Sequence, residues 1–430
     1  MNAGLLLIGI FFLLLILNVP IAWSIGMAVA LYMVTSSSFS MSYIATTMFT
    51  ACDSFTLMAI PLFILAGALM EGGGLSQRLI DFADSMVGHK RGGLAIVTIL
   101  SCMFFGAISG SSAATVATIG VIMVPSMIKQ GYSKGFSYAL IAAAGVLGVL
   151  IPPSIPFVTY GVATNASIAT MFMGGFGPGI LCGGLLILVS QIICRKNGWE
   201  GNGHTFSWRR VAVTFRSAIG ALLVPVIILG GIYGSIFTPT EAAAVAVVYA
   251  LAVGFLVYRE LTLKKLLEAL SSSAVTTSTI MVIVGTATAL ARMLTLEQIP
   301  MQLANFISSL TDSRILVLIA MNIFLLIVGC VMDGTPAILI LAPILQPIAA
   351  SYGVDIIHFG LMMCLNIAIG FCTPPVGLNL FVATSLGNIQ FTTLCKRLLP
   401  FLAALIVGLL LVTYIPVVSL GIPWLFGYGS

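Results

Sequence analysis

The stretch "FFGAISGSSAATVATIG", residues 104–120, decides how the rest of this chain is read. It places Ser109, Gly110, Ser111 and Ser112 next to one another, without a charge, inside a strongly apolar sequence. Glycine and hydroxyl groups interrupt what would otherwise be a continuous membrane helix. Irregular backbone at membrane depth is tolerated where it is buried in protein or lines a cavity. We therefore expect this stretch to face a functional site.

The composition is that of an all-α polytopic membrane protein. Of the 430 residues, 60% are hydrophobic and 7% are charged, against about a quarter charged in soluble domains. A helical span needs about 20 apolar residues, so there is room for about ten passages. We expect the apolar N-terminus to be a retained membrane helix and not a signal peptide. The net charge of +5 is concentrated in loops, which indicates orientation in the membrane and not nucleic-acid binding.

Cysteine and histidine do not suggest a metal site. The eight cysteines have no CxxC spacing and no accompanying histidines, so we interpret them as small packing residues. His89, His204 and His358 fall near loops or span ends, where solvated or interfacial side chains are expected.

The basic loops predict the topology. Residues 195–216 carry five Lys or Arg against one Glu, which places this connection in the cytoplasm by the positive-inside rule. The segments 217–234 and 239–258 then cross outward and back to a second basic loop, 259–265. From the loop 195–216 toward the N-terminus, a span near 174–194 leads out of the cytoplasm and a span near 136–164 leads back into it.

This assignment of the spans leaves residues 92–125 with both ends in the cytoplasm. Its arms, 92–108 and 112–125, are each shorter than a comfortable span. We predict a re-entrant hairpin with the sequence "SGSS" at its tip.

A similar constellation occurs a second time in "IVGCVMDGTPAILILAPILQP", residues 327–347. Pro125 precedes Pro152 by 27 residues, and Pro347 precedes Pro374 by the same interval. An amphipathic stripe precedes each hairpin at helical spacing. The matched stripe residues are Leu79, Phe82, Ala83 and Met86 in the first copy, and Leu303, Phe306, Ile307 and Leu310 in the second.

Each copy therefore contains an amphipathic helix, a hairpin and a broken span. The breaks are "IPPS" (151–154) and "TPPV" (373–376). Because the span 273–292 runs outward, the second hairpin enters from outside, and the repeats are inverted. Small residues can serve helix packing alone, but two tips and two double prolines in register favour a repeat. Inverted repeats with broken helices that meet at mid-membrane are typical of secondary transporters.

These features divide the chain into five parts. We predict N-terminal scaffold helices and a first arm helix (1–91); a first transport-domain repeat (92–194) with hairpin 92–125 and broken span 136–164; a cytoplasmic loop, central scaffold spans and a second arm helix (195–311); a second transport-domain repeat (312–390) with hairpin 314–347 and broken span 357–386; and a C-terminal span (391–430). The arm helices are expected at 75–89 and 297–311, where ordinary interfacial helices are the alternative.

The tips and breaks offer oxygen ligands for sodium. A broken helix exposes backbone carbonyls at the end of its first half, and nearby hydroxyls complete the shell. For one site we predict Ser109, Ser111, Gly148, Ile151 and Pro153. For its symmetry mate we predict Gly329, Asp333, Thr335, Gly370 and Thr373.

The opposite half-helices direct N–H groups at the same space, which suits a carboxylate substrate. We assign substrate contacts to Ser112, Asp333, Ser154 and Asn379. Asp333 is the one carboxylate at either tip, and intramembrane carboxylates are costly enough to indicate function. Helix capping at "DGTP" is an equally good interpretation. Arg292 is interpreted as an interfacial residue, with a substrate counter-charge as the alternative, and Glu241 as a structural residue at a helix start.

From end to end the chain resembles the large membrane subunit (M subunit, DctM-like) of tripartite ATP-independent periplasmic (TRAP) transporters. The resemblance rests on "IPLFILAGALMEGGGLSQRLIDFA", "GAISGSSAATVATIG", "LIPPSIPFVTYGVAT", "IFTPTEAAAVAVVYAL", "VMDGTPAILILAPIL" and "CTPPVGLNL". It implies an elevator-type transporter, of the kind found in the ion transporter superfamily, in a bacterial inner membrane. Two or more sodium ions would drive import of an organic acid, either a sugar acid such as sialate or a C4-dicarboxylate, with no organic cofactor.

The resemblance also implies two protein partners. One is a small membrane subunit (Q subunit) of about four helices, expected as a separate polypeptide. The other is a soluble periplasmic substrate-binding protein (P subunit) that delivers the substrate. The family's sodium ligands correspond to the two tips and the two helix breaks named above.

Three other functions compete with this interpretation. A standalone sodium–dicarboxylate symporter would share the inverted hairpins but need no binding protein. An intramembrane serine hydrolase built on Ser109 or Ser111 would need a nearby base, and no histidine lies in a confident span interior. A passive channel would be expected to show a ring of charges or a pore motif. The transporter is not expected to be an enzyme.

Overall fold

The computed structural model describes residues 3–17, 19–36, 41–201, 203, 205–387 and 389–429. Every regular element in these residues is a helix. Eight helices are long and apolar enough to cross a membrane, or up to ten if two bent pairs each count as one span. The chain is therefore a multi-pass α-helical membrane protein, as the composition predicts. His204 lies outside the described residues.

The N-terminal part contributes helices that pack around one long helix. Between α3 and α4 the chain bends by 59°. The long helix α14 packs against α2, α3 and α4, and its 34 residues extend about 50 Å. The elements are α1 (Ala3–Ile16), α2 (Ile21–Ser36), α3 (Met41–Cys52), η1 (Thr56–Met58), α4 (Ala59–Gly72) and α14 (Leu263–Leu296).

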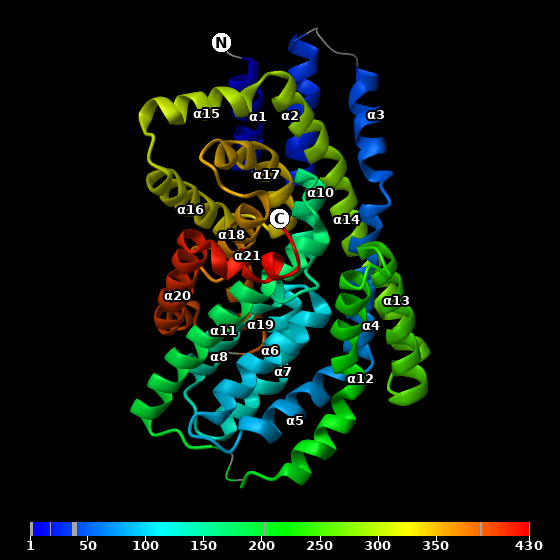
Figure 1. Ribbon diagram of the computed structural model, residues 1–430, viewed down its shortest axis with the longest axis vertical. Helices are drawn as coiled ribbons and strands as arrows, with labels where there is room; N and C mark the ends of the chain where they lie inside the picture. Colours follow the sequence, from blue (N-terminus) through cyan, green and yellow to red (C-terminus); the bar gives the residue numbers. More distant parts are fainter. Residues whose placement is uncertain are drawn as a thin grey trace.

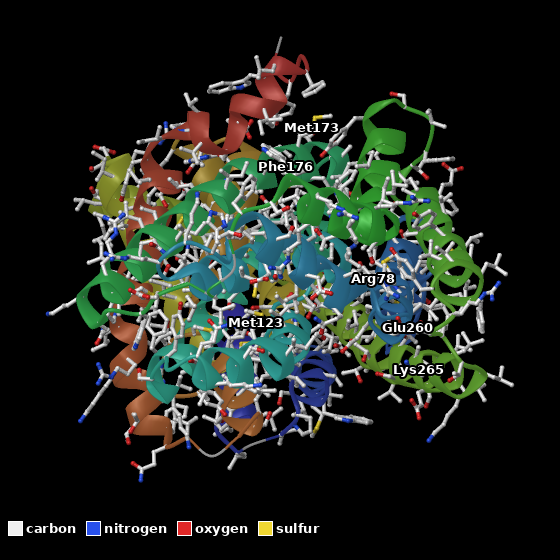
Figure 2. All side chains as sticks on the ribbon, turned by 90° about the horizontal axis from the view of Figure 1, so that it is seen from below. Arg78, Met123, Met173, Phe176, Glu260 and Lys265 are labelled. Atoms are coloured by element: carbon white, nitrogen blue, oxygen red, sulfur yellow. The ribbon has the colours of Figure 1, made fainter. Side chains whose placement is uncertain are left out.

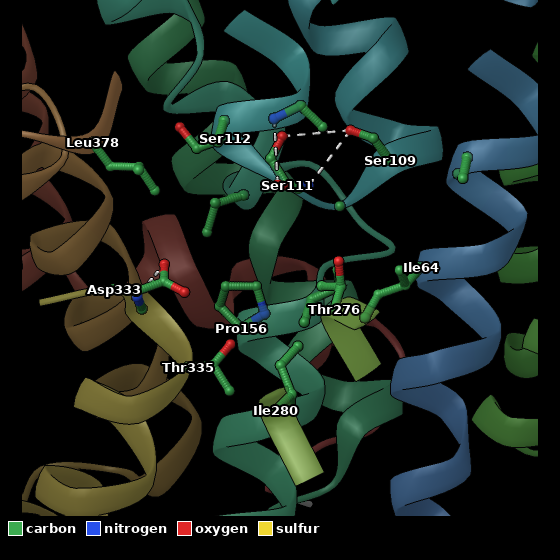
Figure 3. Close-up of a pocket in the computed structure, with 18 of the residues that line it drawn as sticks. Ile64, Ser109, Ser111, Ser112, Pro156, Thr276, Ile280, Asp333, Thr335 and Leu378 are labelled. Carbon is green, nitrogen blue, oxygen red and sulfur yellow. Dashed lines mark hydrogen bonds between the residues drawn. The ribbon is translucent and has the colours of Figure 1, made fainter. Parts of the chain in front are cut away.

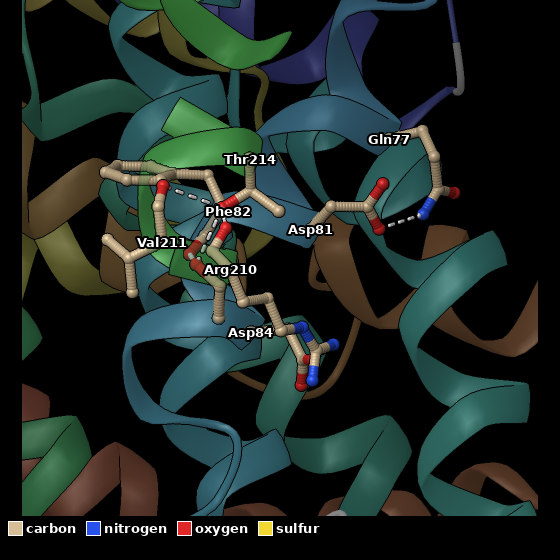
Figure 4. Close-up of polar contacts among 8 residues, drawn as sticks. Gln77, Asp81, Phe82, Asp84, Arg210, Val211 and Thr214 are labelled. Carbon is tan, nitrogen blue, oxygen red and sulfur yellow. Dashed lines mark hydrogen bonds and ion pairs between the residues drawn. The ribbon is translucent and has the colours of Figure 1, made fainter. Parts of the chain in front are cut away.

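The first arm helix, α5 (Leu75–Val87), is tied to the two predicted cytoplasmic loops. Near its start, Arg78 pairs with Glu260 at 2.7 Å, and Figure 2 shows both residues together with Lys265 at one side of the molecule. Near its end, Asp84 accepts from Arg210 at 2.8 Å, as drawn in Figure 4. Both basic loops therefore lie at the same end of the molecule, in agreement with the predicted topology.

The first repeat contains the predicted hairpin and broken span. The hairpin helices α6 (Gly93–Ser109) and α7 (Ser112–Lys129) are joined at Gly110, whose φ of 60° is left-handed. Glycine adopts this conformation without the steric cost that a Cβ would bring. The broken span consists of α8 (Lys134–Ala144), α9 (Leu147–Leu150) and α10 (Ile155–Thr164), with a bend of 45°.

Three longer helices complete the middle of the chain. They are α11 (Ile168–Asn197), α12 (Trp208–Tyr233) and α13 (Pro239–Ala252), the last continued by a π-helical segment over Val253–Val257. At the start of α13, Thr238 and Glu241 form a capping box. This reciprocal pair satisfies backbone N–H groups at the helix start. The structural interpretation of Glu241 is confirmed.

The second repeat has the same order of elements and the opposite direction. It contains the arm helix α15 (Ile299–Leu310), the hairpin α16 (Arg314–Val331) with α17 (Gly334–Ser351), and the broken span α18 (Ile356–Gly370) with α19 (Leu378–Ser385). Figure 1 shows α5 and α15 at opposite ends of the molecule, with the two hairpins reaching toward its middle from those ends. The repeats are inverted.

The two arm helices differ in how well they are covered. Leu79 and Ala83 of the first stripe are fully buried, because α5 packs against α6 and α12. In the second stripe Phe306 is 61% and Leu310 69% exposed. The second arm packs mainly against α17, so one apolar side of it is left open.

Two regions differ from the sequence-based expectations. Residues 391–430, predicted as one span, form α20 (Phe391–Tyr414) followed by a short helix α21 (Pro416–Leu425) that packs against α11. His358 is buried and not solvated: its ring nitrogens contact Ser419 Oγ at 2.6 Å and Thr413 O at 3.1 Å. Both partners come from the C-terminal helices, which cover the start of α18.

Candidate functional site

Both hairpin tips line one cavity of about 280 Å³. Figure 3 shows Ser109, Ser111 and Ser112 of the first tip on one side of it, with Asp333 and Thr335 of the second tip across the space. Other walls come from α4, α10 and α14, with Val149 of α9 and with Phe371 and Leu378 at the second break. The residues from the three helices are Ile64, Gly67, Ala68 and Glu71; Ile155 and Pro156; and Ser272, Ser273, Thr276 and Ile280. The quoted stretch 104–120 therefore lines a cavity, and its role as a functional site stays a prediction.

The first tip holds its hydroxyl groups in a compact network. The Oγ1 of Thr115 donates to the carbonyl of Ser111 at 2.7 Å and lies 3.2 Å from Ser109 Oγ. Ser111 is the N-cap of α7, and its Oγ accepts from Ala114 N at 3.5 Å. Because Ser111 precedes Thr115 by one helical turn, the two residues lie on the same face. The tip therefore gathers three hydroxyls and a carbonyl oxygen.

This tip rests directly on the break of its own broken span. Ile155 N donates to Gly110 O at 3.3 Å, and a Cβ on Gly110 would lie 2.9 Å from Pro153 O. A Cβ on Gly148 would lie 2.7 Å from Ser111 O. Four of the five residues predicted for the first sodium site are thus in close proximity. The side chain of the fifth, Ile151, packs toward Gly179 of α11, and its backbone belongs to the same break.

The second tip shows a related arrangement. Gly377 N donates to Cys330 O at 3.2 Å, so the second break also donates to the end of its hairpin. Gly329 and Gly370 are in backbone contact, since a Cβ on Gly370 would lie 2.5 Å from Gly329 Cα. Thr373 Oγ1 donates to Ile369 O at 2.9 Å. Gly329 and Gly370 of the predicted second site thus meet at this crossing, while Asp333 and Thr335 line the cavity.

Asp333 is both a cap and a cavity residue. It is the N-cap of α17, and its Oδ1 accepts from Gly334 N at 2.7 Å. The carboxylate also lines the cavity, next to Thr335. The capping interpretation is confirmed, and the residue stays available for a ligand through its second oxygen.

A glycine contact in the first repeat mirrors the Gly329–Gly370 contact in the second. A Cβ on Gly106 would lie 2.7 Å from Gly148 Cα. In both repeats, therefore, a hairpin helix crosses a broken helix at a distance that only glycine permits. Three of these four glycines belong to the predicted sodium sites, whereas Gly106 does not, although it lies in the quoted stretch.

The other predicted substrate contacts are mostly internal. Asn379 is buried, and its amide nitrogen donates to Ser112 Oγ at 2.8 Å and to Ala142 O at 3.0 Å. Ser112 lines the cavity. Ser154 is 1% exposed, and its Oγ has no hydrogen-bond partner among the described residues. Of the four, Ser112 and Asp333 line the cavity wall, while Asn379 supports Ser112 from behind.

The charged groups of the cavity are two carboxylates, Glu71 and Asp333. Among the described residues that line it there is no lysine, arginine or histidine. Glu71 lies on α4 and accepts from Thr118 Oγ1 of α7 at 2.7 Å. An anionic ligand in this cavity would have to be held by N–H groups, hydroxyls or bound cations.

Several residues at the tips and along the cavity wall are absent from the predicted set. Thr115 carries a detectable signal, because it follows Ser111 by four residues in an otherwise apolar helix. Glu71 and the hydroxyl-rich run of α14 also stand out in an apolar sequence, but that they face one cavity depends on packing between segments about 200 residues apart in the chain.

Two inverted hairpins and two broken helices that converge on one cavity are typical of a secondary membrane transporter. Residues 8–418 match the family described as the tripartite ATP-independent periplasmic transporter, DctM component. The chain belongs to this family, the large membrane subunits of TRAP transporters.

Named relatives agree with this assignment. The chain is 45% identical to the C4-dicarboxylate TRAP transporter large permease protein DctM of Pseudomonas aeruginosa, over 94% of each chain. It is 46% identical to the isethionate TRAP transporter permease protein DctMQ of Oleidesulfovibrio alaskensis, over 96% of this chain but 65% of that relative, slightly less than two thirds of its length. The sialic acid TRAP transporter large permease protein SiaM of Vibrio cholerae is 38% identical over 97% of this chain and 98% of SiaM.

Solved structures share the fold at low sequence identity. The YdaH transporter of Alcanivorax borkumensis superposes with a TM-score of 0.62 at 15% identity, covering 99% of this chain and 100% of YdaH. MtrF of Neisseria gonorrhoeae gives a TM-score of 0.61 at 13% identity, covering 88% and 85%. At these identities the similarity concerns the fold alone.

Proposed function

We propose that this chain is the sodium-coupled, substrate-translocating subunit of a three-part importer of an organic acid in a bacterial inner membrane. The observation that carries the proposal is the convergence of both hairpin tips on a single cavity. A site to which two inverted halves both contribute can be exposed to either side of the membrane when one part of the protein moves against the other.

Sodium is proposed to bind at the two hairpin–break junctions. At the first junction the hydroxyl of Ser109, the carbonyl and hydroxyl of Ser111, and the carbonyls near Gly148, Ile151 and Pro153 supply neutral oxygens. Thr115 joins this set through its contacts with Ser109 and Ser111. At the second junction Gly329, Asp333, Thr335, Gly370 and Thr373 supply the oxygens, with one negative charge. Carbonyls freed by a helix break are the usual sodium ligands in such folds.

The proposed substrate is an organic acid, a sugar acid such as sialate or a C4-dicarboxylate. The names of the three relatives above refer to isethionate, C4-dicarboxylates and sialic acid, all of which carry acidic groups. With no basic side chain among the described lining residues, bound sodium would offset the negative charge of the substrate. This arrangement couples sodium binding to substrate binding, because each bound ion raises the affinity of the cavity for the other.

Transport is proposed to follow an elevator mechanism. The hairpins and broken spans would move as one body against a scaffold of the other helices, with the arm helices between them. The ion pairs Arg78–Glu260 and Asp84–Arg210 join the first arm helix to the proposed scaffold.

Two partners are proposed from the family. A small membrane subunit of about four helices would pack against the scaffold, and a periplasmic binding protein would deliver the acid. The substrate preference would then depend largely on the binding protein.

Reconstitution into liposomes tests this function. Liposomes containing the chain, the small membrane subunit and the binding protein encoded with it should take up labelled sialate or succinate when sodium is high outside. The same liposomes with an equal potassium gradient should show no uptake. Uptake by the chain alone would instead support a standalone sodium–dicarboxylate symporter, and uptake in all conditions would indicate a passive channel.

A further inference from the structure

Among the cavity walls that belong to neither hairpin, one is formed by the long helix α14. Helix α14 contributes Ser272, Ser273, Thr276 and Ile280 to it, and Figure 3 shows Thr276 and Ile280 beside Pro156. The spacing of four residues between Ser272, Thr276 and Ile280 places them on one face of the helix. We call Ser272, Ser273 and Thr276 the α14 hydroxyl face.

The hydroxyl content of this helix is unusual for a membrane span. Seven of the nine residues 271–279 are serine or threonine. Several satisfy their hydroxyls within the helix, as Ser278 does with Ala274 O at 2.8 Å and Thr279 with Val275 O at 3.0 Å. Such bonds to the preceding turn allow a hydroxyl to remain in an apolar environment.

Ser273 differs from these residues. It is 5% exposed, and its Oγ has no hydrogen-bond partner among the described residues. Buried hydroxyls in folded proteins normally have a partner, and each exception calls for an explanation. The residue lines the cavity, so a ligand there is a partner that the protein itself does not provide.

Thr276 complements Ser273 in hydrogen-bonding character. Its Oγ1 already donates to Ser272 O at 3.0 Å, which leaves its lone pairs to accept a hydrogen bond from a ligand. Ser273 can donate one. The α14 hydroxyl face therefore fits a ligand with both an oxygen acceptor and an O–H donor, and the free carboxylate oxygen of Asp333 adds a second acceptor for such donors.

We propose that the α14 hydroxyl face contacts and positions the substrate, and that the substrate is a hydroxylated acid. This proposal rests on the proposed transport function and adds to it a contribution from the scaffold. Since α14 packs against α2, α3 and α4, its contacts with the substrate exist only while the tips lie beside it. The scaffold thus takes part in binding the substrate in the conformation described here.

The chain offers a matched pair of variants for the test. Thr276→Val and Thr279→Val remove the same hydroxyl from the same helix, each bonded to the preceding turn at 3.0 Å, but Thr279 does not line the cavity. Ser273→Ala removes a hydroxyl with no partner in the protein, and deleting such a group does not cost folding free energy. Ser278→Ala is its control.

The experiment measures sodium-driven uptake of labelled sialate and of labelled succinate by the complete reconstituted system. We expect Thr276→Val and Ser273→Ala each to raise the KM for sialate about 3- to 10-fold, the loss of one hydrogen bond. The sodium concentration for half-maximal uptake should stay unchanged. Thr279→Val and Ser278→Ala should retain the wild-type KM, and all four variants should melt within a few degrees of the wild type.

Three results would overturn the proposal. The first is an unchanged KM in both cavity variants. The second is an equal KM change in Thr276→Val and Thr279→Val, which would indicate a general effect on helix α14 and not a contact with the substrate. The third is sodium-driven uptake of succinate, an acid without a hydroxyl group, whose KM neither Thr276→Val nor Ser273→Ala changes. Failure of the wild type to transport either acid under a sodium gradient would overturn the proposed function, and this inference with it.

Discussion

Ser112 and Asn379, 267 residues apart in the chain, are hydrogen bonded inside the protein, with Asn379 Nδ2 donating to Ser112 Oγ at 2.8 Å. Ser112 begins the second helix of the first hairpin, and Asn379 lies in the first turn of the second half of the second broken span. The tip of one repeat is therefore held by the other repeat. Any movement of the first tip at this point must be shared with the second broken span.

Substitution of Asn379 by alanine should destabilise the protein. The change leaves Ser112 Oγ and Ala142 O without their donor in a buried region, which costs about 1–3 kcal/mol. The melting temperature of the purified protein checks this, with Asn305→Ala on the exposed side of α15 as the neutral control. In the double variant Asn379→Ala with Ser112→Ala, the loss of folding free energy should differ from the sum of the two single losses by about 0.5 kcal/mol or more. Strictly additive losses would show that the bond does not couple the repeats.

The pair Ser109→Ala with Ser111→Ala should impair sodium coupling while the protein still inserts. Removing two of the hydroxyls clustered at the first tip should raise the sodium concentration for half-maximal uptake at least about tenfold, which corresponds to about 1.4 kcal/mol. Ser126→Ala removes a hydroxyl that is bonded within α7, to Ile122 O, and should behave as the wild type. Unchanged sodium dependence in the double variant would refute the first sodium site.

The two roles of Asp333 can be separated by two substitutions. Asparagine caps a helix about as well as aspartate, so Asp333→Asn should keep the melting temperature but reduce sodium-dependent uptake strongly. Asp333→Ala should lose uptake and also about 1 kcal/mol of folding free energy. If Asp333→Asn transports like the wild type, the carboxylate is a cap and its charge has no part in the mechanism.

The glycine contacts between hairpins and broken helices should not tolerate alanine. A Cβ on Gly148 would lie 2.7 Å from Ser111 O, and one on Gly370 would lie 2.5 Å from Gly329 Cα. Backbone cannot yield as a flexible side chain can, so each substitution should cost about 1–3 kcal/mol and lower both the melting temperature and uptake. Gly184→Ala, where nothing lies within 4 Å, is the control. Full activity in Gly148→Ala would contradict the close crossing.

Much of this architecture follows from sequence because repeats leave local marks. The equal spacing of Pro125 and Pro347 from the double prolines marks both hairpins and both breaks. The basic loops predict the direction in which each span crosses the membrane. These directions in turn predict that the second repeat is inverted relative to the first. Helix-breaking glycines, prolines and hydroxyls are chemically obvious in an apolar chain.

Other features depend on contacts that no local pattern records. Asn379 looks like a cavity residue from its position after the break, but its side chain is used to hold Ser112. His358 is near a span end, yet α20 and α21 cover it. The exposed side of α15 and the burial of α5 follow from the helices packed against them, and the two stripes have the same periodicity in the sequence.

Binding of sodium to the purified chain, without substrate or partners, tests the central claim most directly. A ligand that binds only the folded state stabilises it, by about 2.7 kcal/mol at 100 times its dissociation constant. The melting temperature should therefore rise with sodium in a saturable way relative to equal potassium. Combining Ser109→Ala, Ser111→Ala and Asp333→Asn should remove most of this rise. Equal melting temperatures of the wild type in sodium and potassium would contradict the assignment of both hairpin–break junctions as sodium sites.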